Sequence, residues 1–254
     1  MSTHHVGTPK RSAYFREEHE LLKAQIRRFV EEEIKPYALQ WEQDGMVPRD
    51  VLRRMGELGF LGIRYSAEYG GSNMDTLATV VLAEELGRST FSGVAITVLV
   101  HTDMASVHLY NAGSQALKDH FMPDVIAGKK IVAVGVTEPG AGSDVKGIRT
   151  TARREGDGYV LNGTKMFITN GVHADLYCIA AVSSPDARPS QRLSMFLVEK
   201  GTPGFRVGRD LDKQGWRSSD TAELLFEDCR IPATNLLGEE GRGFYGIMQN
   251  FQKI

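Results

Sequence analysis

The chain has 254 residues, enough for one large domain or two smaller domains with separate apolar cores, of which two is the default expectation. Its 30 Lys and Arg residues nearly balance 32 Asp and Glu residues, which gives a formal net charge of −2. This balance argues against the basic surface that gathers nucleic acid, so we expect no nucleic-acid partner.

The cysteines and the N-terminus give no sign of a secreted or membrane protein. Cys178 and Cys229 lie in apolar, strand-like stretches without metal-site spacing, so we interpret both as reduced, packed thiols and expect no metal. The longest uncharged apolar run, residues 94–100, is far shorter than the ~20 residues that cross a bilayer, and the N-terminus lacks the apolar region of a signal peptide. We therefore expect a cytoplasmic protein without a membrane partner.

The first half of the chain has the periodicity of amphipathic helices. Apolar residues recur at intervals of three and four over residues 15–41, and this predicted helix should bend near Pro36. Further helices are predicted after Pro48, over residues 75–86 and over residues 92–110. The last of these is apolar on most faces, so we expect it in the middle of the helical layer.

From Lys130 onwards the pattern changes to that of β-strands. The run IVAVGV is followed, after an interruption, by residues 148–154, the turn EGDG and the sequence YVLNGTKMFITNG, which are typical of paired strands. Short strand-like runs then recur as far as residue 226, a spacing that suits a small antiparallel barrel or sandwich. Residues 243–254 have the pattern of the first turns of a helix.

The interruption is VTEPGAGSD, residues 136–144. Gly140 and Gly142 remove side chains where a backbone can approach a ligand, and Pro139 fixes a backbone dihedral before them. Thr137 and Ser143 add hydroxyls that donate and accept hydrogen bonds. The segment can wrap a flat or phosphorylated ligand or form a wide loop between strands, and its spacing alone leaves the ligand open.

A second stretch, KMFITNG, places Phe167 and Thr169 two residues apart on one face of a predicted strand. An aromatic ring beside a hydrogen-bond donor suits a planar heterocycle. Taken alone, however, Phe167 is better explained as an ordinary core residue.

Several other residues are interpreted as parts of the structure and not of a binding site. Glu138 and Asp144 flank the loop, and carboxylates on a turn are usually solvated. His101 and His108, seven residues apart, are predicted to share one face of a mostly buried helix and not to bind a metal. Trp216 is expected to pack on the edge of the β-barrel.

Together, VTEPGAGSD and the later NGTKMFITNG resemble the acyl-CoA dehydrogenase family. The similarity extends to AEELGR at residues 83–88, FMPDVIAGKKI at residues 121–131 and DTAELLFEDCRIPATNLLGEEGRGF at residues 220–244, so it covers essentially the whole chain. Family members have an all-helical N-terminal domain, a β-domain and a C-terminal four-helix bundle, with FAD held between the last two.

The resemblance therefore implies an α+β chain in three parts. Residues 1–130 would be the all-helical N-terminal domain, and residues 131–241 the antiparallel β-barrel domain that contacts flavin and acyl-CoA. Residues 242–254 would begin the first helix of the C-terminal bundle, so that the chain is truncated before the rest of that bundle.

Roles for individual residues also follow from the resemblance. Thr137 would hydrogen-bond the pyrimidine side of the flavin ring, Phe167 would stand against the ring, and Thr169 would donate towards flavin N5. The implied FAD-binding residues are Val134, Gly135, Val136, Thr137, Gly140, Ala141, Gly142, Ser143, Phe167, Ile168 and Thr169. The implied substrate-binding residues are Ser143, between the cofactor and CoA, and Ile96, Thr97 and Val100, along the fatty acyl tunnel.

The implied reaction is FAD-dependent α,β-dehydrogenation of a fatty acyl-CoA thioester to the trans-2-enoyl-CoA, with hydride transfer to flavin N5. Electron-transfer flavoprotein is the expected acceptor, and full-length family members are homo-oligomers. The reaction needs a carboxylate base, which the family pattern places at or beyond Ile254, where isoleucine cannot accept a proton. No catalytic residue is therefore assigned. The alternatives are a truncated, non-catalytic chain or a related flavoenzyme such as an acyl-CoA oxidase.

Overall fold

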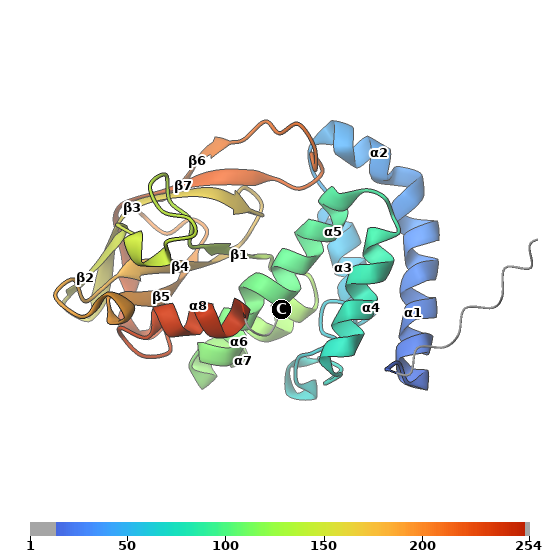
Figure 1. Ribbon diagram of the computed structural model, residues 1–254, viewed down its shortest axis with the longest axis horizontal. Helices are drawn as coiled ribbons and strands as arrows, with labels where there is room; N and C mark the ends of the chain where they lie inside the picture. Colours follow the sequence, from blue (N-terminus) through green and yellow to red (C-terminus); the bar gives the residue numbers. More distant parts are fainter. Residues whose placement is uncertain (1–13, 252–254) are drawn as a thin grey trace, which may run out of the picture.

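The structure is a computed structural model that describes residues 14–251, and Figure 1 shows a group of helices beside a twisted sheet. The helices before the sheet are α1 (Glu17–Phe29), α2 (Lys35–Asp44), α3 (Arg49–Glu57), α4 (Thr76–Gly87), α5 (Ser92–Leu99), α6 (Ser106–Ala112) and α7 (Gln115–Ile126). A π-helical turn, Val30–Ile34, joins α1 to α2 just before Pro36, which confirms the predicted interruption.

The helix predicted over residues 92–110 is divided between α5 and α6 by a second π-helical turn, Val100–Ala105. Two hydroxyl groups in or next to this turn compete with the helical backbone hydrogen bonds. Thr102 Oγ1 donates to the carbonyl of Val98, and Ser106 Oγ donates to the carbonyl of His101. Most residues of the turn are buried, as the central position predicted for this segment requires.

The strands confirm the predicted α+β class. They are β1 (Val132–Gly135), β2 (Thr151–Glu155), β3 (Gly158–Thr169), β4 (Leu176–Val182), β5 (Leu193–Glu199), β6 (Phe205–Asp210), β7 (Thr221–Pro232) and β8 (Leu236–Leu237). They form one sheet in the order β6-β7-β3-β2-β4-β5-β8, with β1 paired to β4. The pairings of β3, β5, β6 and β8 are antiparallel.

Two pairings differ from the antiparallel expectation. β1 runs parallel to β4 from Leu176 to Ile179, and β2 meets β4 in the same direction where Thr151 lies opposite Val182. Because β5 pairs along the whole of β4, β1 and β2 must share its other edge. Residues 136–150 are therefore an excursion of the chain from one strand edge, which explains why turn-forming residues separate two strand-like runs.

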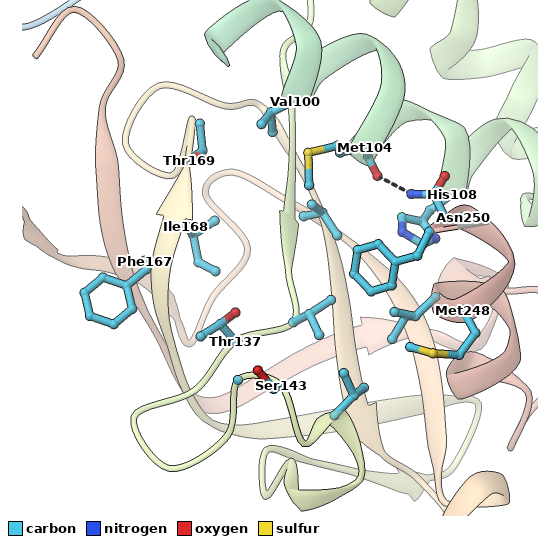
Figure 2. Close-up of a pocket in the computed structure, with 16 residues that line it drawn as sticks. Val100, Met104, His108, Thr137, Ser143, Phe167, Ile168, Thr169, Met248 and Asn250 are labelled. Carbon is cyan, nitrogen blue, oxygen red and sulfur yellow. Dashed lines mark hydrogen bonds between the residues drawn. The ribbon is translucent and has the colours of Figure 1, made fainter. Parts of the chain in front are cut away.

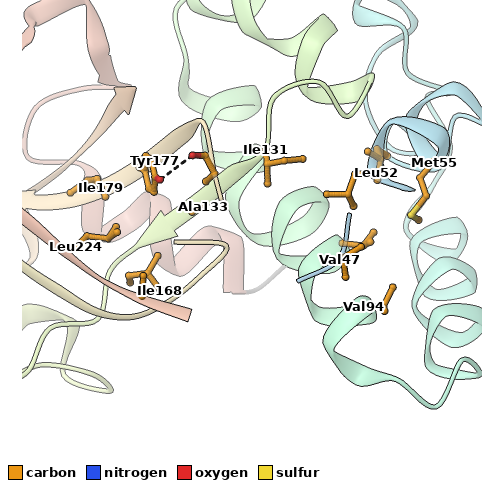
Figure 3. Close-up of a cluster of buried hydrophobic side chains, with 14 of the residues drawn as sticks. Val47, Leu52, Met55, Val94, Ile131, Ala133, Ile168, Tyr177, Ile179 and Leu224 are labelled. Carbon is orange, nitrogen blue, oxygen red and sulfur yellow. Dashed lines mark hydrogen bonds between the residues drawn. The ribbon is translucent and has the colours of Figure 1, made fainter. Parts of the chain in front are cut away.

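One apolar core joins the helices to the sheet, as Figure 3 shows. Leu52 and Met55 of α3 lie in the same buried cluster as Ile179 of β4. Across the same junction, Arg49 makes an ion pair of 2.9 Å with Asp175, at the start of β4. The helices give way to strands between α7 and β1, but the division into domains at residue 130 stays a prediction because the core spans it.

The last described helix, α8 (Gly243–Phe251), packs against β5 and α6 and is the red helix in Figure 1. Its buried residues are Gly243, Ile247 and Asn250. Among residues 14–251, no helix has both the length and the apolar character needed to cross a bilayer.

Both cysteines and Trp216 can be compared with their predicted surroundings. Cys178 and Cys229 are free and buried, as predicted, and burial raises the pKa of the Cys178 thiol to about 12.

The interpretation of Trp216 as a residue packed on the sheet is wrong, because its side chain is 52% exposed. It lies in the loop between β6 and β7, and its φ of 56° is in the left-handed region.

A buried ion pair fixes the excursion against the sheet. Lys165 of β3 is fully buried, and its Nζ lies 2.7 Å from Glu138 Oε1 and 3.2 Å from the carbonyl oxygen of Val136. The Glu138 carboxylate also accepts hydrogen bonds from the backbone N–H groups of Arg149 and Thr150, at 2.7 and 2.9 Å. Both ends of the excursion are thereby held by one carboxylate.

Glu138 is therefore not the solvated turn residue that the sequence predicted, since only 7% of it is exposed. Burial alone would raise the pKa of Glu138, but the charge of Lys165 and the hydrogen bonds outweigh burial and hold that pKa below its ordinary value. Burial lowers the pKa of Lys165 to about 8, against the opposing effect of Glu138, so the ammonium stays charged at pH 7.

Replacing one partner of this pair should cost far more stability than replacing both. Lys165→Met leaves an unpaired buried carboxylate and should lower the free energy of unfolding by about 3–5 kcal/mol. Lys165→Met/Glu138→Gln removes both charges while keeping an acceptor for the backbone, and should lose at least about 1 kcal/mol less. Urea unfolding followed by circular dichroism measures both values.

The control is the exposed pair Arg206–Glu227 in the same sheet, 3.0 Å apart. Arg206→Met should change the free energy of unfolding by less than about 1 kcal/mol, because solvent screens exposed pairs. Equal losses in Lys165→Met and the double variant would contradict the assignment of Glu138 as a buried, ionised partner.

The same pair predicts a dependence of stability on acid. Because the folded-state pKa of Glu138 is depressed, its contribution is present above the unfolded-state pKa and is lost as pH falls through the folded-state pKa. Between pH 6 and pH 3, the wild-type chain should therefore lose more stability than Lys165→Met/Glu138→Gln, in which other carboxylates are unchanged. Parallel urea titrations at each pH test this, and indistinguishable slopes would refute it.

Candidate functional site

A pocket of about 460 Å³ lies where the excursion, β3, the helices around α6 and the helix α8 meet (Figure 2). This volume is in the range of small-molecule and cofactor sites. Its lining residues are Val100, Met104, His108, Val134, Val136, Thr137, Gly142, Ser143, Val145, Phe167, Ile168, Thr169, Ile247, Met248, Asn250 and Phe251. None of these side chains is ionised at neutral pH, so the described lining is uncharged.

One wall comes from Val134 of β1 and from Val136, Thr137, Gly142 and Ser143 of the excursion. Its shape comes from a tight turn in which the backbone N–H of Glu138 donates to Ala141 at 2.8 Å and that of Ala141 donates back at 3.2 Å. Pro139 and Gly140 occupy the two central positions, the first of which favours proline. A Cβ atom at Gly140 or at Gly142 would meet no protein atom within 4 Å.

β3 supplies the facing wall, and it is irregular where it meets the pocket. Its register with β7 shifts between Lys165 and Ile168, and Phe167 has φ of 61°, so this is a β-bulge. Ile168 is buried, whereas Phe167 is 66% exposed and points away from Ile168 in Figure 2. The interpretation of Phe167 as an ordinary core residue is therefore wrong, and the strict alternation that placed Phe167 and Thr169 on one face does not hold at the bulge.

Three hydroxyl groups face the pocket without a protein partner. Among residues 14–251, the side chains of Thr137, Ser143 and Thr169 make no hydrogen bond, although all three line the pocket. The backbone is more constrained, because the carbonyl of Thr137 accepts the N–H of Met166 at 2.9 Å and so joins the excursion to β3. The hydroxyls are free to bind a ligand that lies between the two walls.

The helical side of the pocket is formed by Val100, Met104 and His108, which recur every four residues. Of the three residues predicted along an acyl tunnel, only Val100 reaches the pocket. Thr97 is buried, and its carbonyl accepts a hydrogen bond of 3.0 Å from Asn170. Ile96 packs against the apolar cluster that includes Val100 and Ile247, but it does not line the pocket.

The two helix histidines do not share a face as predicted. His101 Nε2 donates to the carbonyl of Val125 at 3.1 Å, and Nδ1 accepts the backbone N–H of Val132 at 3.1 Å. His108 instead lines the pocket. The π-helical turn between them shifts the angular position of the residues that follow, so a separation of seven no longer means one face.

Three other predicted flavin-site residues lie outside the lining. Gly135 packs closely against the side chain of Ile179 in the sheet, since a Cβ atom there would lie 2.6 Å from Ile179 Cδ1. Gly140 and Ala141 belong to the tight turn, and Ala141 is buried. The predicted position of the base, Ile254, lies outside the described residues.

Several residues of the pocket were not predicted from the sequence. Met104 and His108 could have been found from their spacing of four after Val100. Ile247, Met248, Asn250 and Phe251 come from α8, whose position against α6 depends on tertiary packing that no local motif records.

Another polar cluster, Glu18, His19 and Asp75, has atoms close enough together for a metal. Its hydrogen bonds explain it without one. His19 Nδ1 accepts the backbone N–H of Arg16 at the start of α1, and Asp75 caps α4 by accepting the N–H of Ala78. His19 Nε2 lies 2.9 Å from Asp75, so the cluster joins two helix ends.

Comparison with known proteins identifies the parts of the chain. Residues 16–129 match the family model of the acyl-CoA dehydrogenase N-terminal domain, and residues 133–229 match that of the middle domain. The chain is similar to the mitochondrial long-chain specific acyl-CoA dehydrogenase of Mus musculus, with 44% identity over 92% of this chain and 54% of the relative. It therefore spans about half the length of the curated relatives it matches.

Solved structures give the same result. The acyl-CoA dehydrogenase of Geobacillus kaustophilus matches with a TM-score of 0.92 and 43% identity, over 96% of this chain and 64% of that one. A glutaryl-CoA dehydrogenase of Mycobacterium smegmatis, solved in complex with FADH2, matches with a TM-score of 0.86 and 31% identity, over 94% of this chain and 60% of that one. The chain belongs to the acyl-CoA dehydrogenase family, of which it carries the helical N-terminal and β-sheet middle domains.

Proposed function

We propose that this chain forms the flavin- and acyl-CoA-binding part of an FAD-dependent acyl-CoA dehydrogenase. The supporting observation is that one uncharged pocket brings Thr137 and Ser143 of the excursion together with Phe167 and Thr169 of β3. These residues come from the two sequence stretches that resemble the family. A structural relative that shares 31% identity was solved with FADH2.

The residues present fit a flavin ring. A flat heterocycle with polar edges needs an aromatic or apolar wall and hydrogen-bond donors at its rim. The exposed ring of Phe167, the open space beside Gly142 and the unpartnered hydroxyls of Thr137 and Thr169 meet these needs. Val134, Val136 and Ile168 would add apolar contacts, whereas Gly135, Gly140 and Ala141 would shape the wall from behind.

When bound, FAD supplies the acceptor for the hydride that leaves the β-carbon of an acyl-CoA thioester. Thr169 would hold a hydrogen bond towards flavin N5, where negative charge develops, and Thr137 would hold one at the pyrimidine side. Ser143 would lie between the cofactor and CoA, and Val100 and Met104 would hold the acyl chain. Ile96 and Thr97 would act only by packing behind this wall.

The proton at the α-carbon needs a base, and the described lining of the pocket contains no carboxylate. We therefore place the base outside residues 14–251. Electron-transfer flavoprotein as the acceptor and a homo-oligomeric assembly belong to the same proposal, and both rest on the family relationship.

Binding of FAD tests the proposal without requiring turnover. The protein should quench flavin fluorescence on titration, and Thr169→Val should weaken FAD binding by about 5- to 10-fold through loss of one hydrogen bond. Phe167→Ala should weaken it at least as much, because it removes the aromatic wall.

The matched control is Thr202→Val, a threonine outside the pocket whose hydroxyl donates to the carbonyl of Glu199. This variant should bind FAD like the wild-type chain. If the wild-type chain binds no FAD, or if Thr169→Val and Thr202→Val bind equally, the pocket is not the flavin site.

A further inference from the structure

The pocket contains two buried polar side chains that the proposed function does not use, His108 and Asn250. His108 is only 7% exposed, and no hydrogen bond to its ring is found among residues 14–251. Burial lowers the pKa of His108 to about 4, so the ring is neutral at physiological pH. A neutral imidazole offers one N–H donor and one nitrogen acceptor, and here both lack a protein partner.

His101, in the preceding turn, shows that this is not general for histidines of the segment. His101 is fully buried, yet both of its ring nitrogens have backbone partners at 3.1 Å. Most buried polar groups in proteins are paired in this way. The difference between the two histidines is that the His108 ring lines the pocket.

The surroundings of His108 are apolar except for Asn250. Met104 and Met248 lie on the same side of the pocket as His108, near the place where α6 packs against α8 (Figure 2). Asn250 Nδ2 donates to the carbonyl of Met104 at 3.1 Å, which leaves its Oδ1 without a partner among the described residues. This end of the pocket therefore offers a donor and two acceptors inside an apolar wall.

The unpartnered groups define the chemistry of a suitable ligand. An ionised group would be buried without a counter-charge, because the described lining is uncharged. A saturated hydrocarbon would leave both imidazole nitrogens unpaired. A hydroxyl can donate to the imidazole nitrogen, or it can accept from the imidazole N–H while it donates to Asn250 Oδ1.

We propose that the pocket selects acyl chains that carry a hydroxyl group at the depth of His108, and that the His108 ring recognises this hydroxyl. The inference rests on the proposed function, because it takes the ligand to be an acyl-CoA whose thioester lies near Thr137 and Thr169. In Figure 2 these residues and His108 stand on opposite sides of the pocket. The hydroxyl therefore belongs on a carbon remote from the thioester.

The test uses acyl-CoA thioesters of one chain length, unsubstituted or with a single hydroxyl at successive carbons from mid-chain to the end. Calorimetric titration of the FAD-loaded protein gives a dissociation constant for each thioester. At one carbon, or two adjacent carbons, the hydroxylated thioester should bind at least about fivefold more tightly than the unsubstituted one. Where turnover is measurable, kcat/KM should show the same preference.

Three variants assign the preference to His108. His108→Leu should abolish it, because leucine has neither donor nor acceptor, whereas His108→Gln should retain part of it through the amide. Met104→Leu changes the shape of the same wall without changing its polarity, so the ratio of the two dissociation constants should persist. Circular dichroism establishes that each variant is folded, and His108→Gln serves if His108→Leu is not.

The outcomes separate this inference from the proposed function. If unsubstituted acyl-CoA binds but no hydroxyl position is preferred, the recognition role of His108 is overturned while the proposed function stands. The same holds if the preference survives His108→Leu. If no acyl-CoA binds at all, the proposed function fails, and the inference fails with it.

Discussion

The pocket depends on the buried ion pair between Lys165 and Glu138. Lys165 is fully buried. The Glu138 carboxylate accepts a hydrogen bond from the Lys165 ammonium and two more from backbone N–H groups at the far end of the excursion. A charge at this depth is tolerated only with a complete set of partners. The excursion is therefore held in one position across β3, and its hydroxyl-bearing residues face Thr169.

The same constraint explains the bulge in β3. Lys165 and Ile168 both point inwards although they are three positions apart, which a regular strand with a period of two cannot achieve. The extra residue is accommodated at Phe167, which takes a left-handed conformation and becomes exposed.

Local periodicity predicted most of the helices and strands, because one buried face per element leaves a regular pattern in the sequence. It did not predict the π-helical turn at Val100–Ala105, which coincides with side-chain hydrogen bonds from Thr102 and Ser106 and not with a change in apolar spacing. It also misassigned Glu138, since the partner that buries this residue lies 27 positions away in the chain. Phe167 was misread as a core residue for a related reason. The bulge that exposes it arises because Lys165 and Ile168 both point inwards, and the residue type at position 167 does not indicate a bulge.

The candidate site was predicted best where one continuous motif supplies adjacent contacts, and least well where the contacts come from elements distant in sequence. Residues from VTEPGAGSD and KMFITNG meet in the pocket because a backbone hydrogen bond joins the excursion to β3.

On the helical side, the residues predicted to line the acyl tunnel ended one turn too early. Val100 begins the π-helical turn, and the lining continues through Met104 to His108, whereas Ile96 and Thr97 lie before this turn and do not line the pocket. The contribution of α8 follows from its contacts with α6 and β5, which a sequence pattern cannot specify.

The distribution of polar groups in the pocket limits how it can treat a ligand. Since the described lining has no ionised side chain, negative charge that develops on a bound molecule is stabilised there only by hydrogen-bond donors. The hydroxyls of Thr137, Ser143 and Thr169 can each donate in one state of the ligand and accept in another, because rotation about one bond redirects the proton. They gather where the excursion meets β3, whereas the fixed donor and acceptor of His108 lie towards α8, with apolar side chains between. A molecule with a polar reacting end and a long apolar body therefore has one favourable orientation, with its reacting end at the bulge of β3.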